Sequence, residues 1–392
     1  MRSVVLSGLD FGVLGPLQLS VNRQPVPLGT PKQSAVLALL LINRNRPVSR
    51  DSIIHAIWGD DAPEADAIHN LHVYVANLRK VLGSAGVDPK TVLASARPGY
   101  QLNVPDAACD LGRFNTEKAA GVQAAAAGRF GLASDRLSAA LAQWRASVLD
   151  DLREFRFVEP FATALVEDKV VAHVLRAEAE IACGRADSVI SELEELVAEH
   201  PYREPLWAQL ITAYYLAERQ TDALDAYQRL RATLSEDLGI EPGPTLRTLQ
   251  QRILRQERLD VQQIAQSEAS DVATMLELHT STTGTGASSN RAQLRDVAGR
   301  CYPLETVVTG IGRRDDNSVV LDDPKVSRYH ATIIDTGASF VINDLRSANG
   351  VEVAHQRIRG SATLCDGDVI TIAGYQFTFE VAPVEAHVHD PT

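Results

Sequence analysis

Residues of the types that bind phosphate groups gather in three short motifs in the C-terminal part of the chain. The motifs are Gly312-Arg313, Ser327-Arg328-Tyr329-His330 and Asp344-Leu345-Arg346-Ser347-Ala348-Asn349-Gly350. A guanidinium, short hydroxyls and an amide can bind a phosphate ester when a rigid scaffold holds them on neighbouring loops. Each motif alone occurs often by chance. Because all three follow in order within one β-rich segment, we expect a phosphate-binding site here.

These motifs, in the pattern GR…SRxH…DxxSxNG, resemble those of the forkhead-associated (FHA) domain. The resemblance implies a β-sandwich that recognises phosphothreonine, which carries about −1.5 to −2 charges and three acceptor oxygens. It also implies tight turns at Gly312 and Gly350 and a bracing role for His330. The expected phosphothreonine-binding residues are Arg313, Ser327, Arg328, Ser347 and Asn349. Arg313 and Ser327 would bind the phosphate, and Asn349 would bind the ligand backbone.

A second candidate site lies on a predicted helix over residues 65–82. Its apolar residues recur at three- and four-residue spacing and form one stripe: Ile68, Leu71, Val75, Leu78 and Leu82. The opposite face carries His69, Asn70, Val73, Ala76, Asn77 and Lys80. Asn side chains can contact adenine edges, and a valine can contact a thymine methyl. This face therefore suits DNA recognition, and an ordinary solvated helix face is the alternative.

A predicted β-hairpin follows this helix. Two strand-like runs, 92–94 and 100–104, bracket a turn at Arg97-Pro98-Gly99. A basic hairpin tip suits contact with DNA phosphates or the minor groove, and a plain surface turn is the alternative. Upstream, the sequence predicts a strand over 11–19, a helix that begins after Thr30 and ends near 42, and a helix over 50–58.

Four segments of residues 1–105, "LGPLQL", "TPKQSAVLALLLINRNRPVSRDSII…IWGD", "NLHVYVANLRKVLG" and "RPGYQL", resemble the OmpR-type winged helix of the antibiotic-regulatory-protein (SARP) family. In that family the third helix enters the major groove. The resemblance implies a DNA-binding surface made of Lys32, His69, Asn70, Val73, Asn77, Lys80 and Arg97. Lys32 and Arg97 are the expected phosphate contacts. Arg79 lies near the apolar stripe, so we expect a structural ion pair there.

The segment 106–258 is rich in Ala, Leu, Glu and Arg, which predicts helices. Trp207, Leu210, Tyr214, Ala223 and Tyr227 match the offsets of a tetratricopeptide repeat, and we expect them to pack in a core. The stretches "CDLGRF", "FVEPFATALVED" and "HPYREPLWAQLITAYYLAERQ" resemble the bacterial transcriptional activation domain of SARP proteins. That resemblance implies dimerisation and contact with RNA polymerase.

The whole chain is expected to be a multidomain α+β protein. We predict a winged helix-turn-helix over 1–105, a tetratricopeptide-like all-α domain over 106–258, a linker over 259–291, an all-β FHA sandwich over 292–384 and a tail over 385–392. The linker prediction rests on the Ser, Thr and Gly residues that end this stretch, because such residues bury little apolar area. A short helix beginning near Val272 was also expected before them.

Charge and composition limit the function further. The net charge is −12, but residues 1–105 carry +3, while 106–258 carry −7 and 259–392 carry −8. Only the N-terminal segment has the sign that DNA phosphates attract. The four cysteines form no CxxC pair, and neither a membrane span nor a signal peptide is evident, so we expect a cytoplasmic protein. No catalytic or metal motif is evident, so we expect neither an enzyme nor a cofactor.

The three predicted domains in this order resemble the EmbR-like group of SARP regulators, which carry an appended FHA domain. The resemblance implies promoter DNA and a phosphothreonine-containing Ser/Thr protein kinase as partners, no membrane partner, and genes of cell-wall arabinan synthesis as targets. We therefore expect a transcriptional regulator, most simply an activator, that couples kinase signalling to promoter binding; whether it acts as a homodimer stays open. The alternative is a phosphopeptide-binding adaptor that docks on a kinase and lacks sequence-specific DNA binding.

Overall fold

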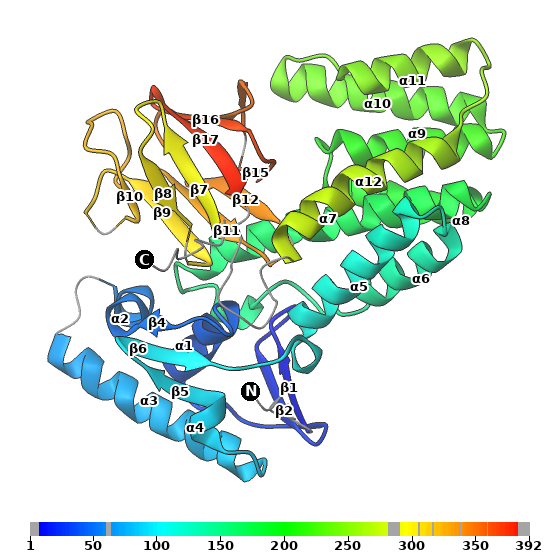
Figure 1. Ribbon diagram of the computed structural model, residues 1–392. Coiled ribbons are helices and arrows are strands. Elements are labelled where there is room, and N and C mark those ends of the chain that lie inside the picture. The colour runs from blue at the N-terminus through cyan, green and yellow to red at the C-terminus, as the bar shows by residue number, and fades with distance from the viewer. Residues whose placement is uncertain are drawn as a thin grey trace, which may run out of the picture. The chain divides into compact units, whose positions relative to one another are not determined.

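The computed structural model describes residues 8–59, 64–280, 291–304, 306–315, 317–337, 339–358 and 360–382 (Figure 1). The architecture is multidomain α+β, as the sequence predicts. The chain divides into two compact units. The first comprises Met1–Thr116, Ala142–Asp168 and Met275–Thr392, and the second comprises Glu117–Leu141 and Lys169–Thr274. Within the described ranges, no helix is long and apolar enough to cross a membrane.

The N-terminal part of the first unit is a winged helix with two small antiparallel sheets. The first sheet has the order β1 (Leu9–Gly12), β2 (Gln18–Val21), β3 (Gln24–Pro25). The helices are α1 (Pro31–Ile42), α2 (Arg50–Trp58), α3 (Glu64–Ser84) and the short α4 (Pro89–Val92). The second sheet has the order β4 (Val48–Ser49), β6 (Gly99–Leu102), β5 (Leu93–Ala96), and its β5–β6 hairpin is the wing.

Local sequence signals place the starts of the first two helices. Thr30 Oγ1 accepts a hydrogen bond from the Gln33 amide at 3.3 Å, and Pro31 occupies the first turn of α1. Ser49 Oγ accepts the Ser52 amide at 3.0 Å where α2 begins. The run 35–42 in α1 is buried throughout, because this helix is the centre of the winged-helix core.

The single strand predicted over 11–19 is wrong. The chain forms two antiparallel strands here, and Leu9 pairs with Val21 at one end of the ladder and Gly12 with Gln18 at the other. The turn between them contains Gly15-Pro16. Proline has no backbone N–H to donate to a ladder, and a Gly-Pro pair favours a turn, so the run of apolar residues folds back on itself.

Helices make up the middle of the chain. They are α5 (Asp110–Ala126), α6 (Phe130–Leu141), α7 (Val158–Ala182), α8 (Asp187–Glu199), α9 (Glu204–Leu216), α10 (Gln220–Leu238), α11 (Pro244–Leu254) and α12 (Val261–Thr280), with short 3-10 turns at Asp106–Ala108 and Asp150–Leu152. The predicted repeat residues Trp207, Leu210, Tyr214, Ala223 and Tyr227 are all buried in one core of the second unit. Their packing role is therefore confirmed.

Helix α12 lies within the stretch that we expected to be a linker. It begins at Val261, well before the short helix expected near Val272. Ala265 and Ala269, one turn apart, are buried against residues of α5, α6 and α7, such as Ala124 and Phe130. This burial stabilises the helix despite the small size of its apolar residues. The remaining linker residues 281–290 and the predicted tail 385–392 lie outside the described residues.

The C-terminal part of the first unit is a β-sandwich. One sheet has the order β10 (Val319–Val320), β9 (Val308–Gly312), β11 (Ala331–Asp335), β12 (Phe340–Asp344), β15 (Ser361–Leu364). The other has the order β14 (Gln356–Arg357), β13 (Val351–Val353), β16 (Val369–Ile372), β17 (Tyr375–Ala382), β7 (Arg291–Asp296), β8 (Cys301–Pro303). Both sheets contribute to one core, in which Ile333 and Ile342 of the first meet Ile370 and Phe377 of the second.

Candidate phosphopeptide and DNA-binding sites

The three phosphate-binding motifs lie on loops at one end of the sandwich. Gly312 ends β9, the Ser327–His330 stretch leads into β11, and the Asp344–Gly350 stretch follows β12. Strands β9, β11 and β12 are neighbours in one sheet, so their loops must meet. Backbone hydrogen bonds tie the first two loops together: the Arg313 amide donates to Ser327 O at 3.0 Å, and the Arg314 amide donates to Arg328 O at 3.3 Å.

The predicted ligand contacts occupy this loop surface. Arg313, Arg328 and Asn349 are exposed, while Ser327 and Ser347 are half-buried. Asn349 Nδ2 donates to Lys325 O at 2.6 Å, and Ser327 Oγ accepts the Ala348 amide at 3.2 Å, so both side chains already belong to the junction of two loops. Arg313 forms no ion pair with the residues that the structure describes, which leaves its guanidinium available for an anion.

His330 braces the loops, as expected. Its ring is fully buried, Nδ1 accepts the Ser327 amide at 3.1 Å, and Nε2 lies 3.1 Å from Gly350 O. A ring nitrogen that accepts carries no proton, so Nε2 must be the donor to the carbonyl. The ring thereby connects the loop that contains Ser327 with the loop that contains Asn349.

Two glycines and one serine shape the same loops. A Cβ on Gly312 would collide with the backbone oxygen of Arg328, so only glycine fits where the first two loops cross. Gly350 has φ of +74°, and a Cβ there would lie 2.5 Å from Arg357 Nε. Ser347 Oγ accepts the Gly350 amide at 3.0 Å. The tight turn predicted at Gly350 is therefore present, whereas Gly312 is the last residue of strand β9 and is required by the close approach of Arg328 O.

Asn317 is a loop residue that the motif pattern does not include. Its side chain is 9% exposed, and Nδ2 donates to Arg314 O at 3.0 Å and to Arg328 O at 2.9 Å. It therefore holds the Arg313 loop against the Ser327 loop from inside. A single Asn in a turn is too common to be singled out from the sequence, so only the structure reveals this role.

The predicted DNA-binding face of α3 is largely exposed, and its apolar stripe is buried except at Ile68, which is half-buried. Leu71, Val75, Leu78 and Leu82 are each at most 2% exposed. On the opposite face His69, Val73, Asn77 and Lys80 are exposed, and Asn70 is half-buried. His72 is also exposed on this face, one turn from His69, and we did not predict it. Val73 is 40% exposed.

Two further contacts fix the surroundings of this face. Asn77 Nδ2 donates to Gln33 Oε1 at 3.2 Å, so part of the predicted reading face contacts the start of α1. Lys32 Nζ lies 5.6 Å from the centre of the Trp58 ring, and that ring stacks on Tyr74 of α3 with centroids 6.0 Å apart. This cation–π contact holds the predicted phosphate-contacting Lys32 beside the helix.

The wing presents Arg97 at its exposed tip, where the Arg97-Pro98 peptide bond is cis. Among the residues that the structure describes, Arg79 has no carboxylate partner, so the expected ion pair is not found there. Instead its guanidinium donates to Leu93 O from Nε at 3.0 Å and from Nη2 at 2.8 Å, and also to Ser95 Oγ at 3.0 Å. Arg79 thus attaches α3 to β5. The role of Arg79 is structural, as expected, but it is carried by hydrogen bonds to a backbone carbonyl and not by an ion pair.

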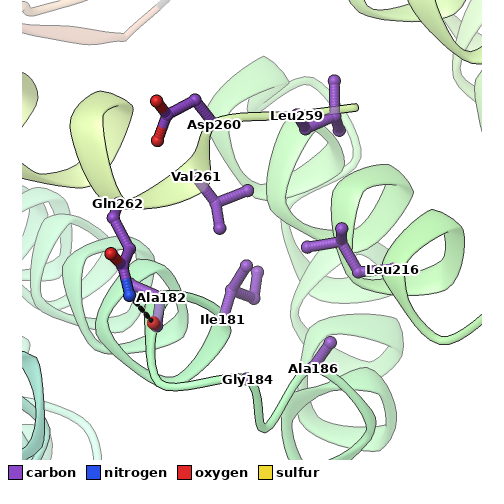
Figure 2. A pocket seen from close by; sticks show the side chains of 9 residues that line it. All are labelled: Ile181, Ala182, Gly184, Ala186, Leu216, Leu259, Asp260, Val261 and Gln262. Carbon is purple, nitrogen blue, oxygen red and sulfur yellow. Dashed lines mark hydrogen bonds between the residues drawn. The ribbon is translucent and has the colours of Figure 1, made fainter. Parts of the chain in front are cut away.

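A separate pocket opens in the second unit (Figure 2). Its wall is mostly aliphatic and includes Ile181, Ala182, Leu216, Leu259 and Val261. Asp260 supplies its one charged side chain, and Gln262 Nε2 is engaged with Ala182 O at 3.1 Å. Such a lining lacks converging polar groups, so the pocket is not a candidate for phosphate or DNA. Within the described ranges, no three His, Cys, Asp or Glu residues are grouped to hold a metal ion.

Comparison with known proteins assigns a family to each segment. The models that match are "Transcriptional regulatory protein, C terminal" over 23–102, "Bacterial transcriptional activator domain" over 109–254 and "FHA domain" over 309–373. The transcriptional regulatory protein MoaR1 of Mycobacterium tuberculosis is 50% identical over 261 residues, which cover 66% of this chain and 84% of MoaR1. MoaR1 therefore matches only about two thirds of the chain.

The transcriptional regulatory protein EmbR of Mycobacterium tuberculosis matches much more of the chain. It is 61% identical over 375 residues, which cover 95% of this chain and 96% of EmbR. A solved structure of Mycobacterium tuberculosis EmbR in complex with a low-affinity phosphopeptide superposes with a TM-score of 0.93 at 60% identity, covering 97% of this chain and 99% of that chain. Because the identity extends through the winged helix, the helical segment and the FHA sandwich alike, this chain belongs to the EmbR family of transcriptional regulatory proteins.

Proposed function

We propose that this protein binds promoter DNA with its winged helix and binds phosphothreonine on a Ser/Thr protein kinase with its FHA domain. One observation carries the proposal. Three segments that are far apart in the sequence place Arg313, Ser327 and Asn349 on one loop surface, braced from behind by His330. A similar chain in the same family has been solved with a phosphopeptide, which supports the same ligand class here.

The chemistry of each group suits this ligand. The exposed Arg313 guanidinium can donate two parallel hydrogen bonds to a phosphate, and a charge-assisted bond of this kind contributes about 1.5–3 kcal/mol. Ser327 supplies a short hydroxyl donor beside it, with Arg328 and Ser347 as the further predicted contacts. Asn349 now bonds a carbonyl, Lys325 O, and we propose that it exchanges this partner for the backbone of the ligand.

For DNA, we propose that α3 enters the major groove. His69, Asn70, Val73 and Asn77 would face the base edges, while Lys80, Lys32 and Arg97 would contact phosphates. The net charge of +3 over residues 1–105 supports this half of the proposal. The adaptor alternative predicts that no duplex is enriched when the intact protein selects from random DNA, whereas a regulator enriches one motif.

The cellular setting completes the proposal. We propose a cytoplasmic regulator without catalytic activity, most simply an activator that contacts RNA polymerase through the helical domain and acts on genes such as those of cell-wall arabinan synthesis. A homodimer would match paired half-sites in a promoter. The functional modules are proposed at 1–105, 106–258 and 292–384.

A peptide array tests whether the FHA domain binds phosphothreonine. Intact protein is applied to kinase-loop peptides that carry phosphothreonine, phosphoserine or the unmodified residue. We expect binding to the phosphothreonine peptides, loss of binding in Arg313→Ala, and retention in Arg300→Ala, which removes an arginine from the turn between β7 and β8 of the same domain. Binding that does not depend on the phosphate, or that survives Arg313→Ala, would refute the proposed site.

A further inference from the structure

The end of the FHA domain opposite the phosphate-binding loops contacts the winged helix. Both parts belong to the first compact unit. Arg46, in the turn between α1 and β4, forms an ion pair with Asp335 at the end of β11, with Nη2 and Oδ2 2.8 Å apart. The Asp335 side chain is only 9% exposed, so this ion pair is shielded from solvent on the carboxylate side.

Four further hydrogen bonds join the sandwich to α5 and to the first part of α7, two from the turn between β11 and β12 and two from the far ends of β12 and β15. Ser339 Oγ donates to Asp168 Oδ1 at 3.0 Å, and Ser361 Oγ donates to Glu167 Oε1 at 2.7 Å. The other two run from Asn343 Nδ2 to Pro160 O at 2.9 Å and from Asn115 Nδ2 to Thr336 O at 3.0 Å. We call the FHA residues of this contact the clamp: Asp335, Thr336, Ser339, Asn343 and Ser361.

The clamp is polar and yet largely buried. Thr336 and Asn343 are each 3% exposed and Ser361 is 7% exposed. Polar side chains with such low exposure require hydrogen-bond partners, since burial without one costs free energy. Asn343 Nδ2 and Ser361 Oγ donate to partners outside the sandwich, whereas the Thr336 hydroxyl donates to Ser339 O within it. The sequence of the FHA domain therefore contains side chains whose burial depends on the rest of the first unit.

Asp335, Thr336 and Ser339 of the clamp lie in the turn at one end of β11 and β12, and the phosphate-binding loops lie at the other end; Asn343 and Ser361 lie nearer to those loops. β11 begins one residue after His330 and ends at Asp335, while β12 begins at Phe340, directly after the clamp turn, and ends at Asp344, the first residue of the third motif. The two strands pair over five residue pairs, and all of β11 is buried. At about 3.3 Å per residue, the two ends are about 13 Å apart along a rigid ladder.

We propose that the clamp couples occupancy of the phosphothreonine site to the winged helix. This coupling rests on the proposed phosphothreonine binding and adds the contacts through which ligand binding would affect the winged helix. When the ligand draws Ser327 and Asn349 together, the adjoining ends of β11 and β12 are displaced. The paired strands transmit this displacement to Asp335 and its ion pair with Arg46. Coupling of this kind is reciprocal, so contacts at Arg46 also change the affinity for phosphopeptide.

The turn that contains Arg46 offers a local readout. The Arg46 amide donates to Asn43 O at 3.0 Å and the Asn45 amide donates to Leu102 O at 2.8 Å, so the exchange rates of both amides report whether this turn opens. Leu102 ends β6, the strand that carries the wing. Arg46 is therefore next to Asn45, whose amide bonds to the β5–β6 hairpin that we propose contacts DNA.

Hydrogen exchange of the intact chain, with and without a saturating phosphothreonine peptide from a kinase activation loop, tests the coupling. We expect protection of the 327–330 and 344–350 loops together with an exchange-rate change of about fivefold or more over 43–49. Asp335→Asn and Arg46→Gln should abolish the change over 43–49 while the loops stay protected. Arg44→Gln is the matched control, because Arg44 lies in the same turn but pairs with Asp106 at 3.0 Å.

The outcomes separate the two proposals. Loops that gain no protection would mean that the phosphothreonine site itself is wrong. Protected loops with an unchanged 43–49 segment, or a change that persists in both Asp335→Asn and Arg46→Gln, would overturn the coupling alone. Because Arg46 is 42% exposed, Arg46→Gln keeps the fold even if the substitution at Asp335 does not.

Discussion

The substitution His330→Ala tests whether loop bracing sets the affinity for phosphopeptide. In the folded domain the imidazole is fully buried and bridges the Ser327 amide and the Gly350 carbonyl, each at 3.1 Å. Alanine removes both partners at once. Each buried backbone group left without a partner costs about 1–3 kcal/mol, so the total is about 2–6 kcal/mol.

Part of this free-energy cost lowers the stability of the domain, and part of it lowers the affinity for the ligand. Typical domains are stable by about 5–15 kcal/mol, so the FHA sandwich stays folded but its loops lose their fixed positions. If about 2 kcal/mol of loop ordering must then be supplied when the ligand binds, the dissociation constant rises about 30-fold. The side chain need not touch the ligand for this effect to appear.

Isothermal titration of the intact protein with a phosphothreonine peptide measures the effect. His355→Ala is the control, because this exposed histidine lies in the turn between β13 and β14 of the same domain. We expect His355→Ala to bind like the parent and His330→Ala to bind about 30-fold more weakly. An unchanged dissociation constant in a folded His330→Ala protein would refute the bracing argument.

Three other substitutions follow from the structure. Asn317→Ala removes two bonds to loop carbonyls, so the dissociation constant for phosphopeptide should rise about tenfold in the same titration; an unchanged value contradicts this role. Asp110→Ala removes the acceptor of two amides in the turn between β1 and β2 and should lower the free energy of unfolding by about 2–6 kcal/mol in urea; a change below about 1 kcal/mol contradicts it. The hydrogen bond from Arg185 lowers the pKa of Glu180 from 4.5 to about 2, so its contribution to stability is present above pH 4.5 and is lost as the pH falls towards 2. Glu180→Gln should therefore flatten this part of the profile of melting temperature against pH, and an unaltered profile would count against it.

Much of the fold followed from periodicity and turn chemistry. The α3 stripe and the repeat residues of α9 and α10 were predicted because apolar spacing alone determines which helix face is buried. The prediction failed where breakers and small residues decide the outcome. One apolar run became β1 and β2 through the Gly15-Pro16 turn, and α12 is stabilised by the burial of two alanines, which carry little hydrophobic signal.

The candidate sites were predicted only in part. Motif order predicted that Arg313, Ser327 and Asn349 lie on neighbouring loops, and the structure brings these loops together; their contacts with a phosphopeptide stay a prediction. The roles of Asn317 and of the clamp could not be predicted, since both depend on contacts between segments that are far apart in sequence. Arg79 shows the same limit, because its partner is a backbone carbonyl of β5 and carries no sequence signature.

Titration of the intact protein with one kinase-loop peptide in its phosphorylated and unmodified forms tests the central claim most directly. We predict binding only to the phosphorylated form, a dissociation constant that rises about 10- to 150-fold in Arg313→Ala, and no change in Arg300→Ala. Equal affinity for the two peptides, or equal affinity of the parent and Arg313→Ala for the phosphorylated one, would contradict it.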